Sequence, residues 1–435
     1  MLLVPERKTL PAGRLRWRIG GLLGVGVLIN YFDRISISVA APQLQATFGL
    51  SDGDLGLLLS AFFWSYALMQ IPAGVLLDRF GVTRIGRWSA FLWAVASLLT
   101  ACATGFAGIF LARLLLGVVE SPNFPAYSKA TGYWFPRAER ALSTSLFDAA
   151  AKFSNVIGVP LIALAVVHLG WRWGFGLSGL LSVFYFIAFW AIYRDPSQHP
   201  QLTREEWHYI TTNGATPDGQ VLAKPARMLG YLLSTRKVWG LSLGFAAYGY
   251  CLYLFLTWLP GYLVQTMHLS ILQSAGFAAI PWACASVSDL LVGGWLIDRL
   301  ISKGLDETRV RKTVLLVGMC FGLAVFGART TTDPIVATAW ISVALSGLAA
   351  AAPVCWSLPS LIAPRGGTGT VGAIMNFTNN MSGVAAPIVT GYIIGRTRSF
   401  SSAFLVAGIV LLLGVACFVF LLGRIEPVPD LEPET

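Results

Sequence analysis

Gly74-Val-Leu-Leu-Asp-Arg79 and Gly294-Trp-Leu-Ile-Asp-Arg299 are two copies of one short pattern, G-x-L-x-D-R, and their last residues lie 220 positions apart. Each copy stands where an apolar run of helix length ends and basic residues begin. The repetition at matching hydropathic positions indicates a chain built from two related halves. Paired helical halves of this kind surround a central cavity in many membrane carriers.

The composition is typical of an integral membrane protein. Of the 435 residues, 55% are hydrophobic and 12% are charged, whereas a soluble domain carries roughly 25% charged residues. Apolar runs of about 20 residues, the length that a helix needs to cross the hydrocarbon core, recur along the whole chain. The net charge of +10 is explained by basic residues that flank these runs, so we expect no nucleic-acid partner.

Hydropathy predicts an all-α membrane protein with twelve transmembrane helices in two six-helix bundles. The predicted spans are 19–41, 54–77, 85–104, 107–131, 141–168, 173–193, 238–265, 271–298, 312–329, 334–357, 368–394 and 400–423. The longest polar stretch lies between the sixth and the seventh span and divides the chain evenly. Within it, Thr203-Arg-Glu-Glu206 predicts the capped start of a short surface helix.

The polar segments set the expected domain boundaries and the orientation. We expect an N-terminal tail over 1–18, a first bundle over 19–193, a linker over 194–237, a second bundle over 238–423 and a C-terminal tail over 424–435. Most lysines and arginines outside the spans lie on the side of the tails and the linker. The positive-inside rule therefore places both termini and the linker in the cytoplasm.

Twelve spans, an even split and the G-x-L-x-D-R pattern after the second and eighth spans resemble the major facilitator superfamily over essentially the whole chain. The motif residues Asp78, Arg79, Asp298 and Arg299 lie at helix ends on one face of the membrane. We expect them to pair across the seam between the bundles and to hold one access state. The alternative is that they only cap helices and anchor them at the interface.

Several charged residues lie inside predicted spans, where a charge at the bilayer centre costs about 2.5–3.5 kcal/mol, and four of them lie deep in the first and fourth spans. Asp33 and Arg34 are adjacent in the first span and point about 100° apart, so they cannot share one partner. Arg113 and Glu120 are nearly two turns apart in the fourth span and project from one face. Arg113 lies at the depth of Asp33, so we expect a contact between the two helices. A purely structural ion-pair network is the alternative.

The positive and negative charges in this group balance, and a buried carboxyl group holds its proton more or less tightly according to its distance from an arginine. An arginine that moves between two acids changes which acid holds a proton, as a proton-coupled carrier requires. The segment Glu120-Ser-Pro-Asn-Phe-Pro125 predicts a bend just beyond the acid, because its prolines remove backbone donors.

Several motifs resemble the anion:cation symporter family, and within it the bacterial sugar-acid proton symporters for galactonate, glucarate and hexuronates. They are Tyr31-Phe-Asp-Arg34, Arg113 to Glu120 with Ser-Pro-Asn-Phe-Pro-Ala after it, Tyr133-Trp-Phe-Pro136 with Glu139-Arg140, and Phe255-Leu-Thr-Trp-Leu-Pro-Gly-Tyr262. The resemblance implies that Asp33 and Glu120 carry protons, that Arg34 binds the substrate carboxylate, and that Arg113 couples them.

Further pocket residues are expected in the second and eleventh spans. Tyr66 and Gln70, one turn apart, resemble cavity-facing positions of the family. Asn376, Asn379 and Asn380 place amides on one face of the eleventh span, and amides suit the hydroxyl groups of a sugar acid. For Asn379 and Asn380, a role in helix–helix packing is an equal alternative.

Lys152 departs from the sugar-acid pattern, which has a neutral residue there. Asp148, four residues earlier on the same helical face, could neutralise it. If Lys152 instead faces the cavity, its charge together with Arg34 favours a diacid or an aromatic acid. Asp289 in the eighth span could be a gate residue, but no motif assigns it a role.

These observations predict a monomeric proton symporter that imports an organic anion such as an aldonate, an aldarate or a hexuronate. Its partners are the anion, protons and the lipid bilayer. A carrier of dicarboxylates or aromatic carboxylates, an exchanger or exporter, and a receptor without flux are the alternatives. The sequence contains no metal-ligand spacing, no cofactor motif and no nucleophile–base set, so we expect neither an enzyme nor a bound cofactor.

Overall fold

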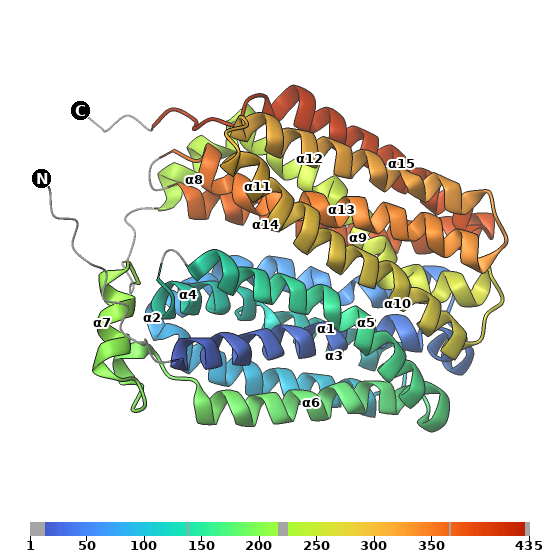
Figure 1. The fold of residues 1–435 in the computed structure, drawn as a ribbon. Coiled ribbons are helices and arrows are strands. Elements are labelled where there is room, and N and C mark those ends of the chain that lie inside the picture. Colours follow the sequence, from blue (N-terminus) through green and yellow to red (C-terminus); the bar gives the residue numbers. More distant parts are fainter. Residues whose placement is uncertain (1–13, 137–138, 216–224, 365–366, 431–435) are drawn as a thin grey trace, which may run out of the picture.

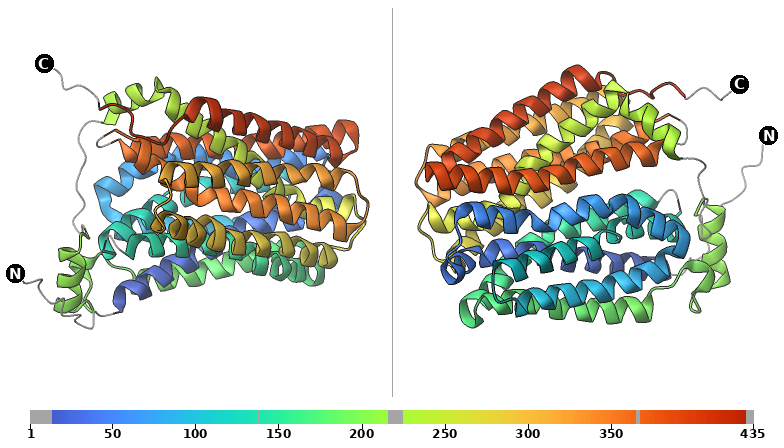
Figure 2. Two further views of the ribbon diagram at one scale, coloured as in Figure 1. Left: turned by 45° about the horizontal axis from the view of Figure 1, so that its top comes forward. Right: turned by 180° about the vertical axis from the view of Figure 1, so that it is seen from behind.

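The computed structural model describes residues 14–136, 139–215, 225–364 and 367–430. Within these ranges the chain is helical and contains no strand. The long helices form two bundles that lie one against the other, with the blue-to-green half of the chain in one and the yellow-to-red half in the other (Figures 1 and 2). The all-α, two-bundle prediction is thereby confirmed.

The first bundle makes six passes. Its helices are α1 (Leu15–Phe48), α2 (Asp52–Cys102), α3 (Phe106–Glu120), α4 (Asn123–Trp134), α5 (Arg140–Leu169) and α6 (Trp171–Ile192). Helix α2 comprises two passes that join at Gly81, where φ is 77° and ψ is 164°, a conformation that favours glycine. Helices α3 and α4 form one pass, interrupted at Ser121-Pro122. The predicted bend after Glu120 is therefore present as a break.

The second bundle repeats the six-pass plan. Its helices are α9 (Arg236–Gln265), α10 (Ile271–Ser288), α11 (Ile297–Ser302), α12 (Glu307–Gly322), α13 (Pro334–Ile362), α14 (Thr368–Thr397) and α15 (Phe400–Ala416). The π-helical segment η3 (Asp289–Leu296) joins α10 to α11 in one pass. The 3₁₀ segment η4 (Leu323–Arg329) extends α12, and the π-helical segment η5 (Cys417–Leu422) extends α15.

The passes have the length and surface of membrane helices. Ten of them are long and apolar enough to cross a membrane by length and composition. Residues 52–80 of α2 and helix α14 complete the twelve. Large apolar side chains such as Leu68, Phe184 and Phe420 are exposed by 68–71% on the outside of the bundles, as expected of residues that contact lipid.

The linker carries η2 (Pro196–Gln198), α7 (Arg204–Thr212) and α8 (Pro225–Leu233). These linker helices and the start of α1 lie at the same end of the bundles (Figure 1). We call this the terminal end and the opposite one the far end. The predicted cap is confirmed, because the Thr203 hydroxyl accepts a hydrogen bond from the backbone N–H of Glu206 at 3.2 Å.

Glu206 anchors α7 to the first bundle. Its carboxylate is 1% exposed and accepts hydrogen bonds from the backbone N–H groups of Leu15 and Arg16, at the N-terminus of α1. The Arg16 guanidinium forms ion pairs with Glu206 (3.1 Å) and Glu139 (2.7 Å). Burial raises the pKa of Glu139, but hydrogen bonds from Arg16 and Tyr209 outweigh this effect, so the pKa is lowered below 4.5. The Glu139 contribution to stability is therefore present above pH 4.5 and is lost in more acid solution.

We expect Glu206→Ala to lower the free energy of unfolding by about 2 kcal/mol, because buried donors at the start of α1 and on Arg16 lose a charged acceptor. The midpoint of thermal unfolding in detergent measures this loss. Glu205→Ala is the matched control, since the neighbouring Glu205 is exposed and should leave the midpoint unchanged. Equal midpoints for both variants would contradict the anchoring role.

The bundles meet along three helix pairs, α2 with α14, α5 with α10, and α1 with α9. At the far end the contact is between backbones. A Cβ added at Gly391 would overlap the carbonyl oxygen of Asp52, and one added at Gly56 would lie 2.6 Å from the carbonyl oxygen of Pro387. Gln265 also donates a hydrogen bond to Gln45 across the seam at 3.0 Å. The far end is therefore closed.

Candidate functional site

The four charged residues predicted at the centre are buried together in the first bundle. Asp33 and Arg34 on α1 are 1% and 5% exposed, and Arg113 and Glu120 on α3 are 2% and 0% exposed. Because a buried charge is stable only with partners, their contacts indicate what each one can do.

Arg34 lies in a cage of aromatic rings. Its guanidinium carbon is 4.9 Å from the ring centre of Tyr31, 4.6 Å from that of Phe62 and 5.0 Å from that of Tyr66. Cation–π attraction offsets part of the cost of removing the charge from water. Nε and Nη2 of Arg34 have no hydrogen-bond partner among the described residues. The ring faces thus stabilise the charge and leave N–H donors for another group.

Glu120 is the nearest acid to Arg34. Its Oε2 lies 3.8 Å from Nη2 of Arg34, too far for a hydrogen bond. Neither carboxyl oxygen of Glu120 has a hydrogen-bond partner in the described part of the chain. The residue stands at the end of α3, where the Ser121-Pro122 break begins. Arg34 and Glu120 thus form a loose pair that an anion could separate.

Asp33 points away from this pair, as the 100° rule for adjacent helix residues predicts. Its carboxylate accepts hydrogen bonds from Trp93 Nε1 (2.6 Å), Ser178 Oγ (2.8 Å) and Ser182 Oγ (3.2 Å). The expected contact between Arg113 and Asp33 is present, but Arg113 Nη1 donates to the backbone carbonyl of Asp33 at 2.8 Å. This hydrogen bond holds the Arg113 guanidinium against α1 at Asp33.

Asn30, one turn before Arg34 on α1, was not predicted. It is 1% exposed, and both atoms of its amide lack a hydrogen-bond partner among the described residues. A buried amide without partners marks a place for water or a ligand group. In the sequence, Asn30 is distinguished only as an amide residue within an apolar run, four residues before Arg34.

The other predicted pocket residues lie on both sides of the seam. Tyr66 is part of the Arg34 cage, whereas Gln70 donates a weak 3.4 Å hydrogen bond to the Tyr66 backbone. In the second bundle Asn380 donates to the Asn376 side chain at 3.2 Å.

Tyr253 on α9 joins these asparagines to the first bundle. Its hydroxyl donates to Asn380 and accepts from Asn379, both at 3.4 Å, and its ring packs 4.7 Å from that of Phe63. These contacts favour a packing role for Asn379 and Asn380, the alternative that the sequence left open. No charge or motif distinguishes Tyr253 in the sequence.

Lys152 lies between two carboxylates. Its Nζ is 2.6 Å from Asp148 Oδ2 on the same helix and 2.7 Å from Asp289 Oδ2 in the second bundle. The lysine is 8% exposed at its side chain. Asp148 therefore neutralises it, as one alternative predicted. Asp289, to which the sequence assigned no role, completes an ion-paired triad across the seam.

The predicted gate residues lie at the terminal ends of their helices. Arg79 is exposed beside the ring of Phe80 (5.3 Å), and Arg299 is exposed beside that of Trp295 (4.9 Å). The side chains of Asp78 and Asp298 lie outside the part of the chain that the structure describes.

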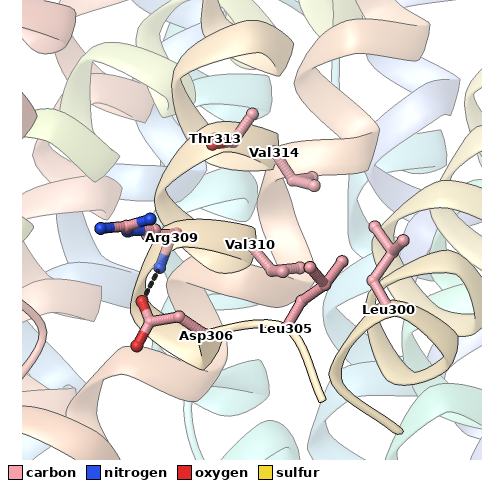
Figure 3. Close-up of a pocket in the computed structure, with 7 residues that line it drawn as sticks. All are labelled: Leu300, Leu305, Asp306, Arg309, Val310, Thr313 and Val314. Carbon is pink, nitrogen blue, oxygen red and sulfur yellow. Dashed lines mark hydrogen bonds between the residues drawn. The ribbon is translucent and has the colours of Figure 1, made fainter. Parts of the chain in front are cut away.

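A surface cleft at the terminal end of the second bundle is a separate feature (Figure 3). Its volume is about 300 Å³, and it is lined by Leu300, Leu305, Asp306, Arg309, Val310, Thr313 and Val314. Asp306 turns its carboxylate to the backbone N–H of Arg309 at 2.7 Å and so caps α12. The lining of the cleft is mostly apolar, and the Asp306 carboxylate is already engaged in capping α12. None of the four buried charged residues of the first bundle lines this cleft.

The buried site occurs in a chain with full-length relatives. Residues 23–387 match the family described as Major Facilitator Superfamily. The chain is 42% identical to the uncharacterized transporter YybO of Bacillus subtilis, over 98% of each chain. It is 30% identical to the probable galactarate/D-glucarate transporter GudP of Escherichia coli, over 96% and 95% of the two chains.

Two further similarities cover nearly the whole length. The D-galactonate transporter of Escherichia coli is 31% identical, over 96% of this chain and 97% of that one. A bacterial homologue of the human lysosomal transporter Spinster, solved inward-facing and occupied, superposes with a TM-score of 0.71 at 18% identity, over 94% and 97% of the two chains. The fold and the order of the helices are therefore those of known carriers.

Proposed function

This chain belongs to the Major Facilitator Superfamily, and on that premise we propose that it is a proton-coupled symporter which imports a sugar acid. It is a transporter and not an enzyme. The observation that carries the finer proposal is the loose pair of Arg34 and Glu120. A caged guanidinium with unpartnered donors faces a carboxyl group that has no hydrogen bond of its own.

In the proposed bound state the substrate carboxylate takes the two free donors of Arg34. A guanidinium matches a carboxylate with two parallel hydrogen bonds, which fixes the orientation of the substrate. The Tyr66 hydroxyl, the Gln70 amide and the amide of Asn376 are then available to substrate hydroxyl groups. Relatives that carry galactonate, galactarate or glucarate in their names support this substrate class.

Coupling follows from the same pair. When a substrate carboxylate occupies Arg34, an ionised Glu120 beside it would be a second anion without a partner, so Glu120 binds a proton. When the substrate leaves, Glu120 returns to Arg34 and releases that proton. Arg113 is bonded to the Asp33 backbone and lies on the helix of Glu120. We propose that it links Asp33 to this exchange.

We propose that the terminal end faces the cytoplasm in the inner membrane of a bacterium, since basic residues gather there. The bundles 19–193 and 238–423 then rock about the central site as a monomer. Asp78 and Arg79, with Asp298 and Arg299, close the cytoplasmic end in the opposite state. The closed far end supports a state that opens inward.

Reconstitution into liposomes tests this function. With an inward proton gradient and no other driving force, we expect D-galactonate to accumulate above its external concentration. Collapse of the gradient with a protonophore should reduce uptake to equilibration. Accumulation that survives the protonophore would contradict proton symport, and exchange of preloaded substrate without net accumulation would favour an antiporter.

A further inference from the structure

Asp148, Lys152 and Asp289 form an ion-paired triad that has no part in the proposed transport cycle. Both carboxylates contact Lys152 Nζ at hydrogen-bond distance. The side chains of Lys152 and Asp289 are 8% and 5% exposed, whereas Asp148 is 36% exposed. Lys152 therefore offers no unpaired positive charge to a ligand. The second oxygen of Asp289, Oδ1, is buried without a hydrogen-bond partner among the described atoms.

The triad lies beside the Arg34 site. Tyr31 contacts Arg34 through its ring (4.9 Å) and is within electrostatic range of Asp148 and Lys152. Tyr248, on α9 of the second bundle, is within electrostatic range of Tyr31, Asp148 and Asp289. Tyr31 is thus within range of two differently paired cations at the seam between the bundles. The first is Arg34, which has unpartnered donors, and the second is Lys152, whose charge is already matched by Asp148 and Asp289.

The net charge of the central site matches a substrate with a single negative charge. Arg34 and Arg113 balance Asp33 and Glu120, so one proton on Glu120 leaves a single positive charge. A substrate with one carboxylate restores neutrality. A dicarboxylate of similar length would place its second carboxylate near the triad. There Asp148 and Asp289 already surround the ammonium group of Lys152. A buried anion without a partner is strongly unfavourable.

We infer that this transporter selects sugar acids with one carboxylate over those with two, and that Asp289 is a residue which sets this preference. The inference rests on the proposed function and names its substrate class as aldonates rather than aldarates. Asp289 acts by holding the ammonium group of Lys152 away from a second carboxylate. The far hydroxyl group of an aldonate can instead donate to the unpartnered Oδ1 of Asp289.

Galactonate and galactarate test the inference, because they differ only in the group at C6, a hydroxymethyl in one and a carboxylate in the other. Apparent dissociation constants come from ligand-dependent thermal shifts of the purified full chain. For the wild type we expect galactonate to bind at least about tenfold more tightly than galactarate. Tighter or equal binding of galactarate would overturn the inference and leave the sugar-acid function standing. No binding of either would overturn the function as well.

Asp289→Asn is the specificity variant. It keeps the size of the side chain and leaves Lys152 paired with Asp148, so no charge loses its only partner. We expect the preference for galactonate to narrow to about threefold or less, through tighter binding of galactarate. An unchanged preference would overturn the role of Asp289. Asp148→Asn, at a more exposed carboxylate of the same triad, should narrow it too and replaces Asp289→Asn if that variant does not fold.

The matched control is Glu426→Gln. Glu426 is paired with Lys237 at 3.1 Å, and its side chain is 60% exposed at the surface. This change removes a paired carboxylate far from the seam, so it should leave both dissociation constants unchanged. A change in preference in this variant as well would assign the effect to net charge and not to the triad.

Discussion

Arg34→Ala should abolish sugar-acid binding, with a loss in affinity of at least about 100-fold. Nε and Nη2 of Arg34 are two of the three unpartnered guanidinium donors among the described residues of the central site, and the third is Nε of Arg113. A charge-assisted pair lost from a buried site costs about 2–5 kcal/mol. The variant also leaves Glu120 without its nearest cation. Titration of D-galactonate against thermal unfolding of the purified protein measures the loss.

Two further variants separate binding from folding. Arg34→Lys keeps the charge but loses the parallel hydrogen bonds, so it should retain weak binding and lie between wild type and Arg34→Ala. Arg18→Ala removes an exposed arginine from the same helix and should bind like wild type. If Arg34→Ala folds and still binds D-galactonate with wild-type affinity, the carboxylate is held elsewhere and the proposed site is wrong.

Glu120→Gln should uncouple the carrier from protons. Glutamine resembles a protonated glutamate that cannot ionise, so the variant is fixed in the form that accompanies bound substrate. In liposomes we expect gradient-driven accumulation to fall to equilibration, a ratio of about one. Exchange of internal for external D-galactonate should persist, because it needs no change of protonation. We also expect the exchange rate of the variant to depend less on pH than that of the wild type.

Glu205→Gln provides the control for this experiment, since it replaces an exposed glutamate in the linker and should accumulate substrate normally. The result that would reject the coupling role is uphill uptake by Glu120→Gln at the wild-type level. Loss of both accumulation and exchange would assign Glu120 to substrate binding instead.

The fold was predictable because hydropathy is a strong signal over helix lengths. The repeated hexads ending at Arg79 and Arg299, and the apolar runs around them, were enough for twelve passes and two bundles. The break after Glu120 followed from Pro122, which cannot donate a backbone hydrogen bond. The tight join at Gly81 was not predicted, since a glycine in a short polar turn has no unusual signal in the sequence.

Only the charged residues of the central site could be predicted from the sequence. Arg34, Arg113, Asp33 and Glu120 stand out because ionised groups are rare in apolar spans. Their depth also predicted that α1 and α3 meet. It did not show that Arg113 bonds to a backbone oxygen, because that depends on how the helices pack.

The neutral partners of these charges gave no comparable signal. Trp93, Ser178 and Ser182, which hold the Asp33 carboxylate, are ordinary residues of membrane helices. Tyr253 and the pairing of Lys152 with Asp289 join segments more than 100 residues apart. Only the packed bundles bring such residues together.

The backbone contact at Gly56 and Gly391 bears on how well the membrane keeps its voltage. A charge that crosses an energised bilayer releases about 2.3 kcal/mol for each 100 mV, so any continuous file of water beside the carrier would dissipate that store. With no Cβ on either glycine, the two main chains touch and leave no side-chain gap in which such a file could form. Larger residues at these two positions would therefore be expected to make the resting protein leaky to ions.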